Sequence, residues 1–218
     1  MTRCVVNVAT GRYVRGQERL SRLISEKFIF FCNEMPPGSP EHADVPYAFK
    51  AHALVAADRA GADLVLWLDA AIKPVGSLEP IWKQIEEQGY WFTGNDAGPV
   101  GHWCCDAALP LLGVTREEAC SMDEVTTCAF GLNLKSDIGK AFLAEFMLLA
   151  QNGAFRGPWK NINGEASTDP RVRGHRHDQT AASVIANRLG MRFKDLPGLL
   201  AYKGHEVEET VLVADGAY

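Results

Sequence analysis

The chain lacks a regularly spaced cysteine framework. Its six cysteines lie at positions 4, 32, 104, 105, 120 and 128, and several fall in apolar runs where cysteine behaves as a small hydrophobic residue. We therefore expect reduced thiols rather than disulfides. Adjacent Cys104 and Cys105 also lack the two-residue gap that lets both sulfurs of a pair reach one tetrahedral ion, which argues against a zinc site.

An excess of positive charge and a long apolar segment are also missing. With 22 Lys and Arg against 27 Asp and Glu, the net charge of −5 gives no overall attraction to nucleic acid or to anionic membranes. The start of the chain has no apolar signal-peptide core. The richest later stretch, residues 141–150, is too short to span a bilayer and contains Glu145. We expect a soluble, cytoplasmic protein without a membrane span.

Neither of the two common glycine-rich phosphate motifs is present. No G-x-G-x-x-G follows a strand, and no G-x-x-x-x-G-K-[ST] occurs. The first predicted strand, residues 4–10, leads instead into "ATGRY", which contains Ala9, Thr10, Gly11 and Tyr13. Gly11 allows close backbone approach and Tyr13 offers a ring, so the segment could hold a nucleotide base. A simple β-turn explains the same residues.

What the chain does have is enough apolar sequence for one core. Its 218 residues are 47% hydrophobic, which suits a single domain over residues 1–218. The predicted strands of the first half are residues 4–10, 27–32, 64–68 and 90–95. The predicted helices are residues 17–26, 47–59 and 77–88, with a proline-rich loop at 33–46. This alternation predicts an α/β fold with a mixed, mostly parallel sheet flanked by helices.

The second half is less regular. A capping box from Thr115 to Glu118 predicts a short helix, and residues 126–135 predict a further strand. Ser136 is expected to cap a helix that runs to about residue 151, and another helix is predicted from Asp178. Residues 152–177 are polar and too long for an ordinary connection, which favours a lid or binding loop.

Asp69 ends a strand that is otherwise apolar. The run at residues 64–68 has no polar alternation, which is typical of a strand covered on both faces of a parallel sheet. The C-terminal edge of such a sheet is where ligands bind. Asp69 is therefore a candidate metal or substrate contact, although an aspartate here can also cap the next turn.

Two stretches carry a resemblance to a known family. They are "YAFKAHALVAADRAGADLVLWLDAAI" at 47–72 and "GHRHDQTAASVIANRLGM" at 174–191. Together they resemble the GT-A nucleotide-sugar glycosyltransferases, notably the branch of glycogenin and the bacterial lipopolysaccharide galactosyltransferases, and related capsular polysaccharide enzymes. In that family an aromatic and basic helix precedes an apolar strand ending in Asp-x-Asp, and a later helix begins with Asp-Gln. The resemblance implies a Rossmann-like GT-A fold.

The implied activity is transfer of a sugar from a nucleoside-diphosphate sugar, a UDP-sugar above all, to an acceptor. A glycan or lipid-linked saccharide is the implied acceptor. The net negative charge disfavours modified DNA bases as acceptors but does not exclude them. We expect the acceptor site in the loops at residues 96–110 and 152–177, which do not reveal their ligand.

The metal site of the family is only half matched. Asp69 corresponds to the first aspartate of Asp-x-Asp, but Ala71 stands where the second should be. The resemblance implies Mn²⁺ or Mg²⁺ held by Asp69 and, since relatives supply a histidine near the C-terminus, by His205. The alternatives are a solvated loop histidine and a metal-independent site, in which Lys and Arg neutralise the leaving diphosphate.

Further site residues follow from the same resemblance. It places Lys50 at the donor phosphates. Arg171, Arg173 and Arg176 crowd the loop before Asp178 and could neutralise the leaving diphosphate, while a solvated charge run is the alternative. Asp178 would orient the donor sugar and Gln179 would face its reactive side, in a retaining mechanism. A plain helix cap at Asp178, or Asp178 as the base of an inverting enzyme, stays open. His175 and His177 could supply acid–base help.

Two other functions compete with this interpretation. One is a nucleotide-sugar-binding module whose catalysis decayed when the second aspartate became alanine. The other is a nucleotidyltransferase on a similar sheet, for which the segment "ATGRYVRG" provides only a weak triphosphate loop.

Overall fold

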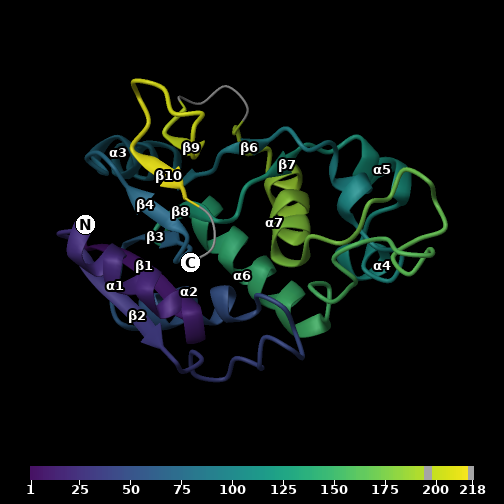
Figure 1. Cartoon of the computed structure of the whole chain (residues 1–218), viewed down its shortest axis with the longest axis horizontal. Helices are drawn as coiled ribbons and strands as arrows, with labels where there is room; N and C mark the ends of the chain where they lie inside the picture. Colours follow the sequence, from purple (N-terminus) through teal and green to yellow (C-terminus); the bar gives the residue numbers. More distant parts are fainter. Residues whose placement is uncertain (194–197, 216–218) are drawn as a thin grey trace.

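The computed structural model describes residues 1–193 and 198–215, and its centre is a five-stranded sheet (Figure 1). The strands, in spatial order, are β2 (Lys27–Cys32), β1 (Arg3–Ala9), β3 (Leu64–Leu68), β8 (Ala129–Asn133) and β5 (Tyr90–Trp91). β1 pairs in parallel with β2 and β3, whereas β8 is antiparallel to both β3 and β5. The sheet is therefore mixed and mostly parallel, as predicted.

Both faces of the sheet are covered by helices. Val65 and Trp67 of β3 pack into the core that contains α2 (Phe49–Arg59), α6 (Asp137–Asn152) and α7 (His177–Arg188). The alternate residues of β3 pack into a second core with α1 (Val14–Leu23) and α3 (Glu79–Gln88). Every residue of β3 is buried. This explains why the strand is apolar throughout instead of alternating.

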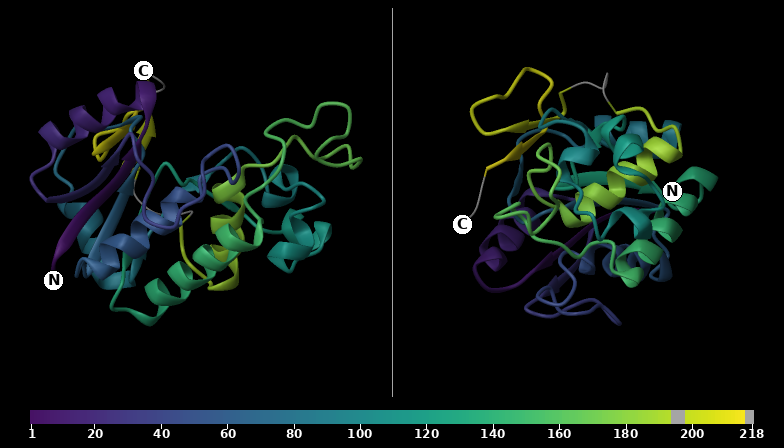
Figure 2. Two further views of the ribbon diagram at one scale, coloured as in Figure 1. Left: turned by 90° about the horizontal axis from the view of Figure 1, so that it is seen from below. Right: turned by 90° about the vertical axis from the view of Figure 1, so that its right-hand side faces the viewer.

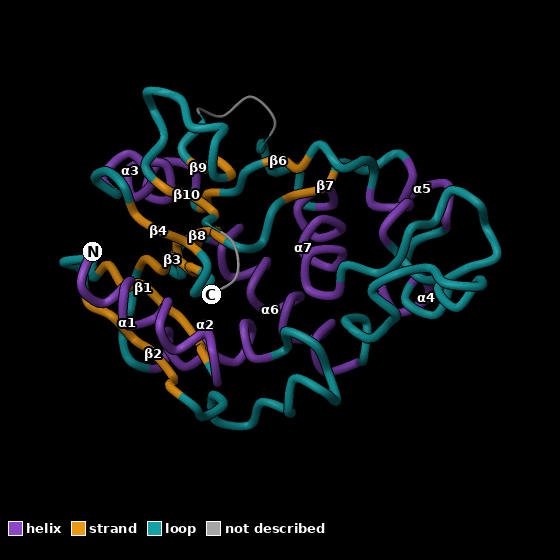
Figure 3. Tube along the Cα trace, in the orientation of Figure 1, coloured by secondary structure: helices purple, strands orange, loops and turns teal. Residues whose placement is uncertain are grey.

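The C-terminal segment returns to the edge of the site. β10 (Leu212–Ala214) lies between β4 (Ile72–Pro74), with which it is antiparallel, and β9 (Leu200–Tyr202), with which it is parallel. Figure 3 shows these three strands beside the central sheet. Because β4 begins three residues after Asp69, this small sheet carries C-terminal side chains to the end of β3.

The other end of the molecule is built from short elements and loops. It holds a 3₁₀ helix at Val100–Trp103, α4 (Leu109–Leu112), α5 (Arg116–Cys120) and the loop at residues 153–176, which projects away from β1 and β2 (Figure 2). Backbone hydrogen bonds join the two predicted acceptor loops: Arg173 N donates to His102 O at 2.8 Å and Asp106 N to Ala166 O at 2.9 Å. The two loops therefore form one unit.

Most predicted elements are present with shifted ends. α1 begins three residues before the predicted helix, and α2 begins at Phe49, two residues later than predicted. The capping box at Thr115 and the Ser136 cap of α6 are confirmed. The predicted strand at 90–95 is wrong as one element, because the chain leaves the central sheet after Trp91. It then pairs again as β6 (Gly94–Asn95) with β7 (Glu124–Val125).

All six cysteines are free thiols, and Cys4, Cys104 and Cys105 are buried. Within the described ranges, no helix has the length and apolarity needed to cross a membrane.

Candidate functional site

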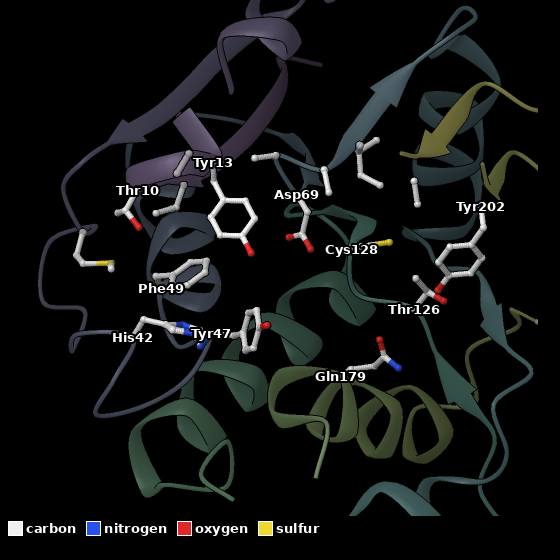
Figure 4. Close-up of a pocket in the computed structure, with 17 residues that line it drawn as sticks. Thr10, Tyr13, His42, Tyr47, Phe49, Asp69, Thr126, Cys128, Gln179 and Tyr202 are labelled. Carbon is white, nitrogen blue, oxygen red and sulfur yellow. Dashed lines mark hydrogen bonds between the residues drawn. The ribbon is translucent and has the colours of Figure 1, made fainter. Parts of the chain in front are cut away.

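A cavity of about 470 Å³ opens at the C-terminal ends of β1 and β3. Figure 4 shows Tyr13 and Asp69 pointing into it from one side and Tyr47 and Gln179 from the other. Residues from β1, the loop before α2, the end of β3, α7 and the C-terminal strands form its wall. The lining residues are Val8, Ala9, Thr10, Tyr13, Met35, His42, Tyr47, Phe49, Asp69, Ala70, Ala71, Ile72, Thr126, Cys128, Gln179, Tyr202 and Ala214.

The first side of the cavity follows directly from β1. After Ala9 the chain turns into a 3₁₀ helix at Gly11–Tyr13 rather than a β-turn, and Gly11 has a φ of 55°, a left-handed value that favours glycine. Gly11 N donates to Asn33 Oδ1 at 3.0 Å, which ties this turn to the end of β2. The turn sets Tyr13 at the cavity, where the residue is 38% exposed.

A buried amide network holds the ends of β1 and β3 together. Asn7 Nδ2 donates to Leu68 O at 2.6 Å, and Gln17 Nε2 donates to Asn7 Oδ1 at 2.8 Å. Both side chains are buried, and buried amides need such partners. The network fixes the carbonyl of the residue just before Asp69.

The Asp69 carboxylate faces the interior of the site rather than the next turn. Its Oδ1 accepts from Trp67 Nε1 at 2.7 Å and lies 3.2 Å from Lys50 Nζ, while its backbone oxygen accepts from Ile72 N. Burial raises the pKa of Asp69, and Lys50 opposes that shift. The carboxylate keeps 30% exposure, so a ligand in the cavity can reach it.

Lys50 lies behind the cavity and joins the two site motifs. Its Nζ is 3.2 Å from Asp69 Oδ1 and 2.9 Å from Asp178 Oδ2, and it donates to Thr127 O at 2.9 Å. Desolvation by burial lowers the pKa of Lys50, but the carboxylates of Asp178 and Asp69 outweigh it, so the net shift is upward. The ammonium is therefore charged throughout the physiological range.

Asp178 and Gln179 stand in the first turn of α7 but do not cap it. The N-cap residue is Arg176, without a side-chain cap, and the Asp178 carboxylate turns to Lys50. Asp178 is 3% exposed, whereas Gln179 lines the cavity. The interpretation of Asp178 as a plain helix cap is wrong.

A second buried charge pair stands behind Gln179. Arg176 Nη1 lies 2.5 Å from Glu124 Oε2, and the Arg176 guanidinium stacks 3.7 Å from the centre of the Trp103 ring. Burial raises the pKa of Glu124 to about 7, with the charge of Arg176 opposing the shift. Glu124 thus pairs with the N-cap residue of α7, three positions before Gln179, and the sequence analysis missed it.

The two histidines before Asp178 are buried in the protein. His175 Nδ1 accepts from Cys105 N at 3.4 Å and its Nε2 lies 3.0 Å from Ala154 O, which defines a neutral ring with the proton on Nε2. Burial lowers the pKa of His175 to about 3 and also lowers that of His177. His175 is unsuited to proton transfer at neutral pH.

The structure brings together some predicted site residues and separates others. Ala9, Thr10, Tyr13, Asp69 and Gln179 line the cavity, with Lys50 and Asp178 directly behind Asp69. The remaining cationic candidates are engaged elsewhere. Arg173 donates to Ala97 O, Arg176 pairs with Glu124, Arg171 pairs with Glu117 and Asp169, and His205 is exposed in the turn after β9. Their roles at the donor stay predictions.

Several lining residues were missed because they come from loops or from the C-terminal strands. Tyr47, predicted as a helix start, has a left-handed φ of 61°, and its ring lies 4.8 Å from that of His42 and 6.0 Å from that of Phe49. Tyr202 reaches the cavity through the β9–β10 pairing. The sequence signal for Tyr47, an aromatic residue just after Pro46, is too common to identify a site.

The side chains present do not fit a resident divalent cation. Within the described residues, no group of three or more His, Cys, Asp and Glu side chains could hold a metal ion. Asp69 Oδ1 is already engaged by Trp67 and Lys50, and Ala71 offers no ligand. Mg²⁺ and Mn²⁺ sites are built from several oxygen ligands, and this wall supplies one carboxylate, so any such ion would depend on oxygens of the bound diphosphate.

No protein-family model and no curated protein sequence matches the chain. Its structure is similar to that of a glycosyltransferase involved in the glycosylation of the major capsid of PBCV-1. The TM-score is 0.55 with 14% identity, covering 98% of this chain and 92% of that one. It is also similar to the WbbM bifunctional glycosyltransferase in its apo structure, with a TM-score of 0.52 and 9% identity, covering 96% of this chain and 45% of that one. Structural similarity at such low sequence identity establishes the fold alone. The chain has the GT-A fold that its two motifs predict.

Proposed function

We propose that the protein is a glycosyltransferase that binds a nucleoside-diphosphate sugar in the cavity and transfers the sugar to an acceptor saccharide. One observation supports this above the others: in a GT-A fold, the strand-end carboxylate Asp69 and the helix-start residue Asp178 share the buried ammonium of Lys50. The two motifs lie far apart in the sequence and meet at a cavity that Gln179 also lines.

The residues that line the cavity suggest the orientation in which the donor binds. The nucleotide fits the side made by Thr10 and Tyr13, where a ring and the turn at Gly11 are available. The diphosphate and sugar then extend past Asp69 toward Gln179. A UDP-sugar is the donor class we propose.

In the reaction, the bond between the anomeric carbon and the phosphate oxygen breaks and an acceptor oxygen bonds to that carbon. The acceptor hydroxyl proton passes to a departing phosphate oxygen, and a nucleoside diphosphate is released. Gln179, which lines the cavity, would orient the sugar at this centre. Asp178 is 3% exposed and ion-paired, which makes it a poor base for an inverting attack and supports retention.

The misfit to a divalent cation favours the metal-independent alternative. Positive charge near the departing diphosphate would come from Arg12, whose Nη2 lies 3.2 Å from the Tyr13 hydroxyl, because the charge of Lys50 is already balanced by Asp69 and Asp178. Cations already in position stabilise a developing phosphate charge without reorganisation.

A donor panel tests the proposal. The protein is incubated with UDP-, GDP- and ADP-sugars, with added Mn²⁺ or with EDTA, and the nucleotide products are separated. We expect nucleoside diphosphate from at least one donor, with turnover retained in EDTA. Pyrophosphate release would indicate a nucleotidyltransferase, and donor binding without any product would indicate a binding module. Either result would contradict the proposed function, and complete loss of turnover in EDTA would overturn the metal-independent part.

A further inference from the structure

A row of three aromatic rings leads from the cavity to the surface of the projecting loop. Tyr47 lines the cavity, and its ring centre is 5.6 Å from that of His177. The Trp159 ring stacks on His177 with centres 5.7 Å apart and an interplanar angle of 20°. Trp159 is 54% exposed, so the outward part of the indole has no protein cover.

Trp159 is held at the base of the loop rather than at a free tip. Asn161 N donates to Arg173 O at 2.8 Å, and His175 N donates to Pro158 O at 2.9 Å, so the two ends of the loop pair on either side of Trp159. A side chain at Gly174 would place its Cβ 2.0 Å from Trp159 O, so only glycine allows this approach. An exposed aromatic residue is thus fixed by its backbone.

Two members of the row adopt strained backbone conformations. Tyr47 and His177 have φ values of 61° and 48°, in the left-handed region that bulky residues rarely enter. Backbone strain of this kind clusters at functional sites. Burial lowers the pKa of His177, so its ring is neutral at physiological pH.

We propose that Trp159, stacked on His177, is the acceptor subsite and binds the apolar C–H face of a pyranose ring. This inference rests on the proposed function, because an acceptor must approach Gln179 from outside the donor cavity. His177 directly precedes Asp178 and Gln179, so a saccharide lying on Trp159 reaches the reaction centre past Tyr47. An aromatic side chain that is already held in place loses little conformational entropy when a saccharide binds to it.

The surroundings suit a saccharide better than a protein partner. The exposed residues around Trp159 include the polar Lys160 and Asn163, which can pair with sugar hydroxyls. Two exposed apolar side chains, Trp159 and Ile162, are too small an apolar area for stable protein docking. Ile162 is equally exposed on the same loop, at 56%, and makes no ring contact with His177, so it provides a matched control.

Binding measurements on the intact protein test the subsite. In the presence of UDP, ligand-observed NMR titrations would use the methyl glycosides of glucose, galactose, mannose and xylose, and lactose. We expect at least one of these to bind, with affinity reduced at least about tenfold by Trp159→Ala and changed by less than about threefold by Trp159→Phe or Ile162→Ala. Absence of binding across the panel, or equal binding by Trp159→Ala, would overturn the subsite.

Calorimetry with UDP separates this inference from the proposed function. UDP should bind wild type and Trp159→Ala equally, which also shows that the variant is folded. Loss of UDP binding in Trp159→Ala would contradict the proposal that Trp159 binds only the acceptor saccharide. If wild type binds a glycoside through Trp159 but no nucleoside diphosphate, the donor assignment fails while the saccharide subsite stands.

Discussion

Lys50 Nζ lies 2.9 Å from Asp178 Oδ2, which joins the helix before β3 to the first turn of α7. The same ammonium is 3.2 Å from Asp69, so the two stretches that carry the family resemblance meet at one cation. Lys50 is buried, and its position explains why an aspartate ends an apolar strand: the carboxylate has a partner already in place.

Lys50→Met should destabilise the protein by about 3 kcal/mol or more, because it leaves two carboxylates without their buried partner. Chemical denaturation measures this loss. Lys73→Met, at an exposed position of β4, is the control and should change stability by less than about 0.5 kcal/mol. The double variant Lys50→Met/Asp178→Asn should recover part of the loss. Equal stability of Lys50→Met and wild type would contradict this account of the ion pair.

Asp69→Asn should lower turnover by about a hundredfold while the protein stays folded. The amide oxygen can still accept from Trp67 Nε1, so the local structure has a substitute partner, but the negative charge in the cavity is lost. The measurement is kcat with the active donor, beside a thermal melt. Near wild-type kinetics in a folded variant would remove Asp69 from the mechanism.

Glu124 should make stability fall as pH rises. Its pKa is raised from 4.5 to about 7 in the folded protein, so between these values the folded state binds more protons than the unfolded state. Wild type should therefore lose stability relative to Glu124→Gln from pH 4.5 to 7, by about 3 kcal/mol at most, with little change above pH 7. Urea unfolding of both proteins across this pH range measures the difference between their free energies of unfolding. A difference that stays constant with pH would show that the pKa of Glu124 is not raised.

His175 should remain neutral well below pH 6.5. Its ring accepts from Cys105 N and faces Ala154 O, and burial lowers its pKa to about 3. NMR of the imidazole should show no titration from pH 8 to 5. Since the unfolded chain takes up that proton below pH 6.5, His175 also lowers stability as pH falls. A His175 titration near pH 6.5 would contradict its burial.

The sequence predicts the central strands well because their signal is strong and local. The apolar run at β3 and the caps at Thr115 and Ser136 depend on neighbouring residues, and the structure confirms them. Asp69 could be placed at the sheet edge for the same reason. Short strands such as β7 and β9 carry no comparable pattern, since two or three residues form a strand only when a distant segment pairs with them.

The parts of the site that the sequence could not predict are long-range contacts. The pairing of Lys50 with both Asp69 and Asp178 requires the packing of α2 and α7 on the same side of the sheet. Glu124 is a single acid in an irregular region, and only the fold brings it to Arg176. Arg171 and Arg176 could not be assigned to Glu117 and Glu124 from the sequence, because these partners lie far away along the chain, although Arg171 also pairs with nearby Asp169.

Gln179 provides the most direct test of the claim that this cavity transfers a sugar. It lines the cavity and lies outside the Lys50 ion pairs, so Gln179→Ala alters the reaction centre without removing a buried charge. Measuring kcat beside the calorimetric Kd for UDP should show kcat reduced at least about a hundredfold and Kd within about threefold of wild type. Gln88→Ala, at the exposed end of α3, should change neither. An unchanged kcat in Gln179→Ala would contradict the account.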